Sequence, residues 1–199
     1  MAGHWNRAIF TPQWIIGRLT EDKRIGLEIQ LGSPELPIRI TFEELVLTVT
    51  ASRLQVSVKR CDDVLLQRAL KVVQRVLMDL THTPMSAVGI NFRFQCDAPE
   101  GRLLEVFNLR DLPNLSDDLV VQRTTINRSL KLKEQDINLT LTFEGGKAGI
   151  DFNFHRAATT AADALKALEA DPIALKNTAI KILQDVYEAT IESEENHGT

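Results

Sequence analysis

The sequence is poor in cysteine and in aromatic residues. Cys61 and Cys96 are the only cysteines among 199 residues, and Phe, Trp and Tyr together account for 6%. Two thiols without a Cys-x-x-Cys pair or a zinc-ligand spacing argue against a disulfide-stapled scaffold and against a zinc site. They are typical of a protein kept in a reducing compartment, so we expect a cytoplasmic location.

Long apolar runs and an excess of one charge are also missing. No stretch approaches the roughly 18 uninterrupted apolar residues that a membrane helix requires, and the first residues do not resemble a secretory signal. The 23 Lys and Arg residues face 27 Asp and Glu residues, which gives a formal net charge of −4. We therefore expect no membrane contact, and the charge does not favour nucleic-acid binding.

Motifs that would hold a metal or a cofactor are absent as well. The four histidines have no histidine partner three or four residues away. Gly145, Gly146 and Lys147 lack the remaining glycine and the hydroxyl residue of a phosphate-binding loop, so they indicate a hairpin turn. The sequence predicts no metal site and no cofactor.

Period-2 alternation of apolar and polar side chains predicts most of the strands. The clearest hairpin pairs residues 44–50 with residues 53–59 through a tight turn at Ala51 and Ser52. Residues 88–95 alternate in the same way and predict a further strand.

Two shorter apolar stretches precede that hairpin. Residues 14–17 and residues 26–31 are interpreted as strands that are joined by a hairpin turn at residues 21–24. A helix is predicted over residues 64–80, because apolar side chains recur there at helical spacing and Asp62 is a suitable N-cap.

The second half of the chain repeats this organisation. Residues 119–133 are expected to be extended, and residues 137–143 and 150–154 alternate as strands around the glycine turn. An alanine-rich helix is predicted over residues 160–170. A last long helix follows from residue 173 to about residue 192, with Pro172 at its first position.

We therefore expect an α+β fold: a curved, mainly antiparallel sheet of about seven strands with the two long helices packed on one face. The hairpin-plus-helix order in residues 1–97 and again in residues 119–192 suggests a degenerate duplication, although it is also common in α+β proteins. We interpret residues 1–199 as a single domain in which residues 193–199 form a flexible tail.

Three features resemble a sporadically distributed, uncharacterised bacterial protein family. They are the opening hairpins, the long helix followed by the strand Gly89–Phe94, and the closing strand Ile150–Phe154 followed after a variable segment by the helical Ile-Leu-Gln-Asp-Val-Tyr segment, Ile182–Tyr187. The resemblance supports the fold and implies a protein of bacterial or phage origin. It implies no activity and no site.

Polar residues on the strand after the glycine turn form the first candidate site. Asp151, Asn153 and His155 should share one strand face, with Glu144 across the turn. Because Asp151 and His155 lie about 13 Å apart along a strand, they do not form a catalytic dyad by themselves. The group is either a solvent-facing row or a binding surface.

A basic stretch forms the second candidate. Residues 122–133 contain Arg123, Arg128, Lys131 and Lys133. If strand order allows, other basic residues join them on one exposed sheet face, namely Arg53, Lys59, Arg60 and Arg93. Such a face is either a solvated surface or a binding surface. As a binding surface it suits an acidic protein better than RNA, because its outward positions lack the aromatic residues on which bases stack.

Residues 99–118 form the third candidate. A short helix is expected near residues 99–109, and Leu104 and Phe107 are apolar residues among charged ones. The segment either docks a partner or covers the end of the sheet.

We predict that the protein is a non-enzymatic interaction protein, namely a subunit, adaptor or inhibitor in a bacterial or phage assembly, with defence against phage as one setting. Its partner would be another protein or a second copy of the chain, bound by the polar sheet face or a sheet edge. Two alternatives stay open. One is a module that binds a small ligand in an apolar cavity between sheet and helix. The other is a hydrolase or nuclease that uses Asp151, His155, Glu144 and Arg93.

Overall fold

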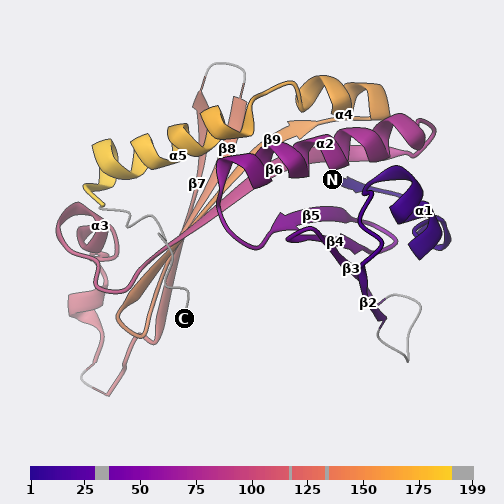
Figure 1. Cartoon of the computed structure of the whole chain (residues 1–199). Helices are drawn as coiled ribbons and strands as arrows, with labels where there is room; N and C mark the ends of the chain where they lie inside the picture. Colours follow the sequence, from indigo (N-terminus) through magenta and orange to yellow (C-terminus); the bar gives the residue numbers. More distant parts are fainter. Residues whose placement is uncertain (30–35, 117, 133–134, 190–199) are drawn as a thin grey trace. The chain divides into compact units, whose positions relative to one another are not determined.

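The computed structural model describes residues 1–29, 36–116, 118–132 and 135–189, and Figure 1 labels its elements. It combines α-helices with two antiparallel sheets, so the predicted α+β class is confirmed. One sheet has five strands in the order β1-β6-β9-β8-β7, and the other has four in the order β2-β3-β4-β5. The chain divides into two compact units, unit 1 (Met1–Gly89 and Arg156–Ile173) and unit 2 (Ile90–His155 and Ala174–Thr199).

The described residues contain strands and helices in the following order along the chain. The strands are β1 (Ala2–Gly3), β2 (Gly26–Ile29), β3 (Ile38–Phe42), β4 (Leu45–Val49), β5 (Leu54–Val58), β6 (Met85–Cys96), β7 (Arg123–Leu132), β8 (Gln135–Glu144) and β9 (Lys147–Ala157). The helices are α1 (Pro12–Arg18), α2 (Asp63–Asp79), α3 (Gly101–Glu105), α4 (Ala161–Ala167) and α5 (Pro172–Tyr187), with single 3-10 turns at Arg7–Ile9 and Leu112–Asn114.

The four-stranded sheet of unit 1 contains the hairpin that the alternation predicted. β4 and β5 pair in antiparallel register from Leu45 opposite Val58 to Val49 opposite Leu54. Leu45, Leu47 and Val49 are alternate residues of β4, and their side chains are fully buried. β3 was not predicted, although its side chains alternate in the same manner and it pairs with β4 along its whole length.

Helix α2 begins and ends close to its predicted positions. The Asp62 carboxylate accepts a hydrogen bond from the Leu65 backbone N–H at 3.0 Å, which satisfies one of the unpaired donors of the first turn. Leu65, Val72 and Val76 are buried at helical spacing. The helix lies against β5 and α4, so its apolar stripe contributes to the core of unit 1.

The predicted strand at residues 14–17 is wrong, because these residues belong to α1. The Thr11 hydroxyl caps this helix by accepting a hydrogen bond from the Trp14 N–H, and Pro12 occupies the first turn. Thr followed by Pro is a helix start signal that outweighs a short apolar run. Residues 21–24 consequently connect α1 to β2 and do not form a hairpin turn.

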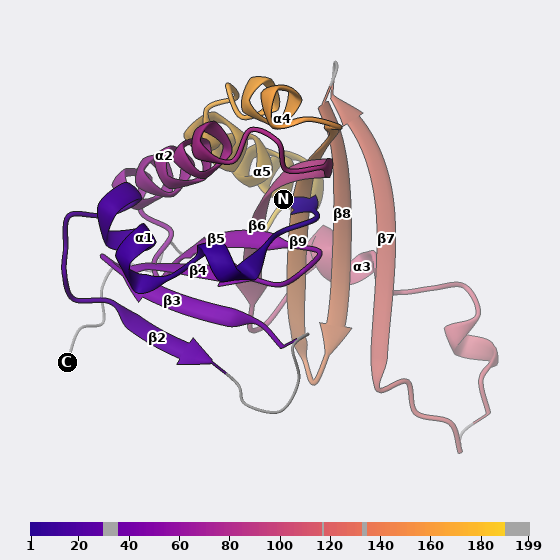
Figure 2. The ribbon, with the colours of Figure 1, turned by 90° about the vertical axis from the view of Figure 1, so that its right-hand side faces the viewer.

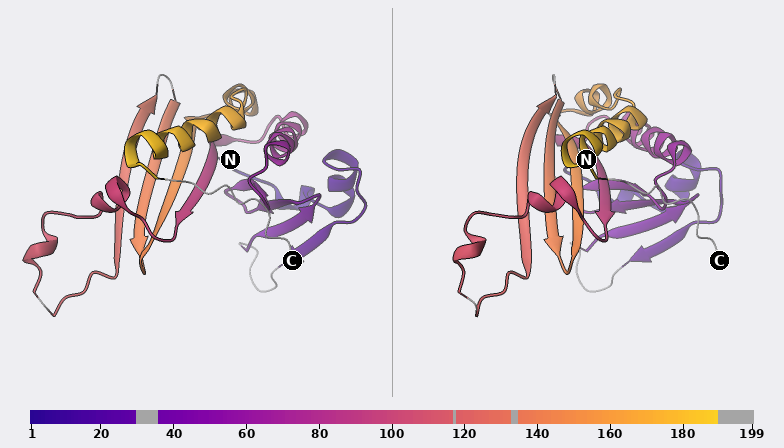
Figure 3. Two further views of the ribbon diagram at one scale, coloured as in Figure 1. Left: turned by 60° about the vertical axis from the view of Figure 1, so that its left-hand side comes forward. Right: turned by 90° about the vertical axis from the view of Figure 1, so that its left-hand side faces the viewer.

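Unit 2 is built on long strands. β7 pairs with β8, and β8 with β9, in unbroken antiparallel register. Aromatic rings from β6 and β9 meet edge to face, with Phe92 against Phe154 and Phe94 against Phe152. Helix α5, yellow in Figure 3, lies across one face of this sheet, and its buried residues Ala179, Leu183 and Tyr187 recur every four positions.

The strands form two sheets where one of about seven strands was expected. The chain leaves β5 through the 17-residue helix α2 before β6 begins. Alternation shows which side of a strand is buried but not which strand lies beside it, so it does not reveal this division. The single-domain assignment and the duplication stay predictions.

In the part of the chain that is described, no helix is both long and apolar enough to cross a membrane. Helix α5 ends at Tyr187, five residues before the predicted end. Residues 190–192 of that prediction and the expected tail at residues 193–199 lie outside the described residues, as do residues 30 and 31 of the expected second strand.

Candidate interaction surface on the five-stranded sheet

A polar face covers three neighbouring strands of unit 2. Asp151, Asn153 and His155 lie on one face of β9, as predicted, because alternate residues of a strand share a face. β7, β8 and β9 run side by side (Figure 2). In the strand register, each of these three β9 residues lies in a row with one polar residue of β8 and one of β7. The three rows are Asp151, Thr140 and Asn127; Asn153, Asn138 and Ser129; and His155, Asp136 and Lys131. We call these nine residues the polar face.

Hydrogen bonds connect residues of one row across the strands. The Arg93 Nε on β6 donates to Asp151 Oδ1 at 2.5 Å, and the Thr140 hydroxyl donates to Asn127 Oδ1 at 2.9 Å. The hydrogen bond and the charge of Asp151 raise the pKa of the Arg93 guanidinium. Arg93 remains largely exposed, so this is a surface pair whose main effect is to hold the side chain in one orientation.

The predicted basic stretch is charge-balanced in three dimensions. Arg123 lies opposite Glu144, with Nε to Oε2 3.9 Å apart, and Lys131 lies opposite Asp136, with Nζ to Oδ1 4.0 Å apart. The acids come from β8, which pairs with β7 along its full length. Each of these two cations therefore has an acidic neighbour one strand inward, which offsets part of the positive charge that a nucleic-acid backbone would bind. Lys133 lies outside the described residues.

Arg128 does not join Arg123 and Lys131 on that face. Its partner in the register is the buried Leu139, so it belongs to the opposite, apolar face. There the Arg128 Nη1 donates to the Tyr187 hydroxyl at 3.0 Å, and the guanidinium lies 5.7 Å from the centre of the tyrosine ring. Of the other basic residues weighed with this stretch, Arg93 lies on β6 and pairs with Asp151 of the polar face. The remaining three lie on or beside β5 in unit 1: Arg53, Lys59 and Arg60.

The predicted acid–histidine pair is too widely spaced for a catalytic dyad, and Asp136, which lies opposite His155 in the register, forms its ion pair with Lys131. Asp151 and His155 are four residues apart on one strand, so they lie about 13 Å from each other. Asp151 accepts its hydrogen bond from Arg93, and the His155 backbone carbonyl accepts one from Gln135 Nε2 at 3.3 Å. Within the described residues, no three His, Cys, Asp or Glu side chains are close enough to hold a metal ion.

The predicted docking segment at residues 99–118 presents only some of its apolar residues. Phe107 is buried, and its ring lies 5.3 Å from that of Phe143 on β8. Leu103 is also buried, whereas Leu104 is exposed on the other side of α3. Phe107 therefore packs in the core of unit 2, which leaves Leu104 as the residue of this predicted pair that a partner can reach.

The outermost strand of the sheet is its most accessible feature. β7 ends the strand order, and in the part of the chain that is described β8 is its only neighbour. Three consecutive apolar residues precede β7, and their side chains are exposed to 60% (Leu119), 82% (Val120) and 46% (Val121). The sequence predicted an extended segment here but not that it forms a sheet edge, because strand order is a tertiary property.

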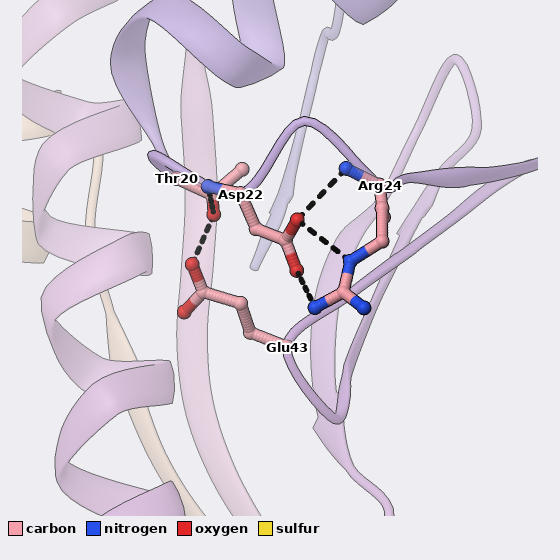
Figure 4. A network of polar contacts seen from close by, with 4 residues as sticks. All are labelled: Thr20, Asp22, Arg24 and Glu43. Atoms are coloured by element: carbon pink, nitrogen blue, oxygen red, sulfur yellow. Dashed lines mark hydrogen bonds and ion pairs between the residues drawn. The ribbon is translucent and has the colours of Figure 1, made fainter.

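A second polar cluster, in unit 1, was not anticipated. Glu43 and Glu44 form the two-residue turn between β3 and β4, and both have positive φ angles, 46° and 65°. The Glu43 carboxylate accepts a hydrogen bond from the buried Thr20 hydroxyl (Figure 4) and forms an ion pair with Arg68 of α2. Arg60 pairs with Glu44 at 2.7 Å.

The cluster continues through the segment between α1 and β2. The Thr20 hydroxyl accepts a hydrogen bond from the Asp22 backbone N–H at 3.0 Å, and Asp22 in turn accepts hydrogen bonds from Arg24 (Figure 4). Hydrogen bonds from the Arg24 backbone and side chain lower the pKa of Asp22. Thr20 therefore links this segment to Glu43, a long-range contact that no local sequence pattern indicates.

Comparisons of the chain with protein-family models, with curated proteins and with solved structures gave no match. The resemblance to an uncharacterised bacterial family stays a prediction.

Proposed function

We propose that this protein is a non-enzymatic interaction module that binds a partner protein by adding one of the partner's strands to the edge strand β7. The observation that supports the proposal is the length and regularity of that edge. β7 has ten residues, and its register with β8 is unbroken from Arg123 opposite Glu144 to Leu132 opposite Gln135.

An antiparallel strand directs the backbone groups of alternate residues toward its neighbour and those of the other residues away from it. About half of the backbone N–H and C=O groups of β7 therefore point away from β8. Proteins usually protect such an edge with a short strand, a proline, a bulge or charged side chains, and of these β7 has only the charged side chains. β7 contains no proline, no glycine and no irregularity of register, so it can accept a long partner strand.

The apolar segment before β7 supports the same function. Leu119, Val120 and Val121 precede β7 with one residue between them and the strand, and they expose consecutive apolar side chains. A protein rarely exposes such a run unless another surface covers it. A strand that pairs with β7 and extends past Arg123 would bury this segment.

The chemistry of unit 2 favours binding over catalysis. Arg93 and Asp151 neutralise each other, and Asp151 lies too far from His155 for proton transfer between them. The proposal covers a subunit, an adaptor or an inhibitor in a bacterial or phage assembly of the cytoplasm.

Hydrogen exchange of the β7 amides in the isolated full-length protein tests the proposal. We expect alternate amides between Arg123 and Leu132 to exchange rapidly, while the intervening amides, which bond β8, are protected. Slow exchange at every position would show that the chain itself covers β7, and would overturn the proposal.

A matched pair of variants tests strand addition directly. Ser129→Pro removes one N–H from β7. It should prevent an added peptide of alternating valine and threonine from slowing hydrogen exchange of the β7 amides, whereas Ser129→Ala should not. Circular dichroism checks that both variants are folded. If the proline variant does not fold, the wild-type protein with an N-methylated peptide replaces it. Equal binding of the methylated and unmethylated peptides would contradict strand addition.

A further inference from the structure

The edge strand β7 carries positive charge only. Arg123, Arg128 and Lys131 are its ionisable residues, and it has no Asp or Glu between Arg123 and Leu132. The acids that balance the sheet face lie one strand further in, on β8. A strand added beside β7 would therefore have three cationic side chains as its immediate neighbours.

Two of these cations, Arg123 and Lys131, are available to a partner on the polar face, while Arg128 donates to Tyr187 on the other face. The Arg123–Glu144 and Lys131–Asp136 pairs are 3.9 and 4.0 Å long, and all four side chains are exposed to 60% or more. Exposed ion pairs of this length contribute little to stability, because water and salt screen them. A carboxylate on an added strand would bind the same cations without first disrupting a buried interaction.

The same charges disfavour a second copy of the chain as the added strand. If two β7 strands paired antiparallel around Asn127, Arg123 of each would lie opposite Lys131 of the other. Like charges directly opposite each other on neighbouring strands are destabilising. The pattern thus acts against self-association while leaving the edge open to a different protein.

We propose that the occupant of the β7 edge is an acidic, extended segment of another protein that pairs antiparallel with β7. This inference rests on the proposed function and specifies the partner's chemistry. We choose the antiparallel direction because the rest of the sheet is antiparallel, and antiparallel pairs are slightly more stable per residue.

The register sets the spacing of the acids on the partner. Going from Lys131 to Arg128 and then to Arg123, the cations are three and five residues apart. Arg123 and Lys131 share one face of the sheet about 27 Å apart, and Arg128 lies on the other face. Beyond the acid opposite Arg123, the partner segment should be apolar, because it then faces Val121 and Val120.

Three synthetic peptides of about ten residues test this inference on the full-length protein. The first has glutamates at its first, fourth and ninth positions within alternating valine and threonine. The second has lysine at those positions, and the third keeps the glutamates but moves them to the second, sixth and eighth positions. We expect the first peptide to bind at least about tenfold more tightly than the other two, and its affinity to fall as salt is raised.

A pair of double variants separates local charge from net charge. Arg123→Gln with Lys131→Gln should remove most of the preference for the first peptide. Arg18→Gln with Lys59→Gln changes the net charge equally at exposed positions of unit 1 and should leave the preference intact. We also expect no dimer formed by pairing of two β7 strands, and light scattering of the wild-type protein tests this.

The possible failures of the two proposals differ. Equal affinity for the glutamate and lysine peptides, with the β7 amides protected by both, would overturn the acidic partner and leave strand addition standing. Protection of the β7 amides by self-association would make a second copy the occupant and would overturn the inference. Rapid exchange of the β7 amides in the presence of every peptide would count against both proposals.

Discussion

Glu44 and Gly146 occupy the same position in two hairpins of this chain. Each is the second residue of a two-residue turn, between β3 and β4 and between β8 and β9, and each has a positive φ, 65° and 79°. The first residues, Glu43 and Gly145, are also left-handed, at 46° and 57°. Such turns suit the twist of a hairpin and normally use glycine or asparagine, so one hairpin follows this rule and the other bears the strain of two glutamates.

Replacing Glu44 with glycine should stabilise the protein. A left-handed residue other than glycine costs roughly 1–2 kcal/mol, while the exposed Arg60–Glu44 ion pair contributes at most about 1 kcal/mol. We expect Glu44→Gly to raise the free energy of unfolding by about 0.5–1 kcal/mol, as measured by urea denaturation.

The second hairpin provides the reverse experiment. No atom lies within 4 Å of the position that a Cβ of residue 146 would occupy, so Gly146→Ala adds backbone strain without a steric clash. We expect a loss of about 1 kcal/mol in the free energy of unfolding. For the first hairpin, a lower free energy of unfolding in Glu44→Gly would show that the glutamate side chain stabilises the protein by more than its left-handed backbone costs.

Thr20→Val should destabilise the protein by about 1–3 kcal/mol. The buried Thr20 hydroxyl donates to the Glu43 carboxylate and accepts from the Asp22 N–H. Valine has a similar volume but leaves both partners without that hydrogen bond. Urea denaturation measures the effect. Thr178→Val is the control, because the Thr178 hydroxyl donates within its own helix, to the Ala174 carbonyl. A larger change than that of Thr20→Val would contradict the assigned role.

Phe107 and Leu104 should respond in opposite ways to truncation. Phe107→Ala removes a buried ring that packs against Phe143, and we expect a loss of about 3–5 kcal/mol. Leu104→Ala removes an exposed side chain and should change the free energy of unfolding by less than about 0.5 kcal/mol. Thermal or urea denaturation of the two variants distinguishes a core residue from an accessible one. A small effect at Phe107 would mean that its ring does not pack in the core.

Stability should fall in acid, partly because of the capping box of α4. Hydrogen bonds from the side chains and backbone of Thr159 and Thr160 lower the pKa of Asp163. A carboxyl whose pKa is lower in the folded than in the unfolded state stabilises the fold above the unfolded value, near 3.9. This contribution disappears as the pH falls through the folded value.

Urea denaturation at pH 7 and at about pH 3 measures this effect. We expect the wild-type protein to be less stable at the lower pH and the difference to shrink in Asp163→Asn. Glu105→Gln removes one exposed negative charge on α3 and serves as the control. An unchanged difference in Asp163→Asn would show that the capping carboxylate is not a source of the acid sensitivity.

Local patterns predicted individual elements where a signal was contained in a few neighbouring residues. Asp62 indicated the start of α2, and alternation indicated β4, β5, β8 and β9. Residues 14–17 were misread because a run of four apolar residues is compatible with either a strand or a buried helix turn. The capping hydroxyl of Thr11 decided in favour of the helix.

Three features of the candidate sites depended on strand order and register instead. Arg123 and Lys131 looked like a basic patch until their neighbours Glu144 and Asp136 were placed beside them. The edge position of β7 follows from the strand order, and the contact between Thr20 and Glu43 joins residues 23 positions apart in the sequence.

By itself, the sequence determined the α+β class, the N-cap of α2, the sidedness of the predicted strands and the shared face of Asp151, Asn153 and His155, because each depends on local periodicity or a nearby capping group. Only the tertiary structure decided that the strands form two sheets, that Phe107 is buried and that β7 is an edge with acids one strand inward. These properties depend on which segments pack together, and that choice is set by the burial of whole faces rather than by any short stretch of chain.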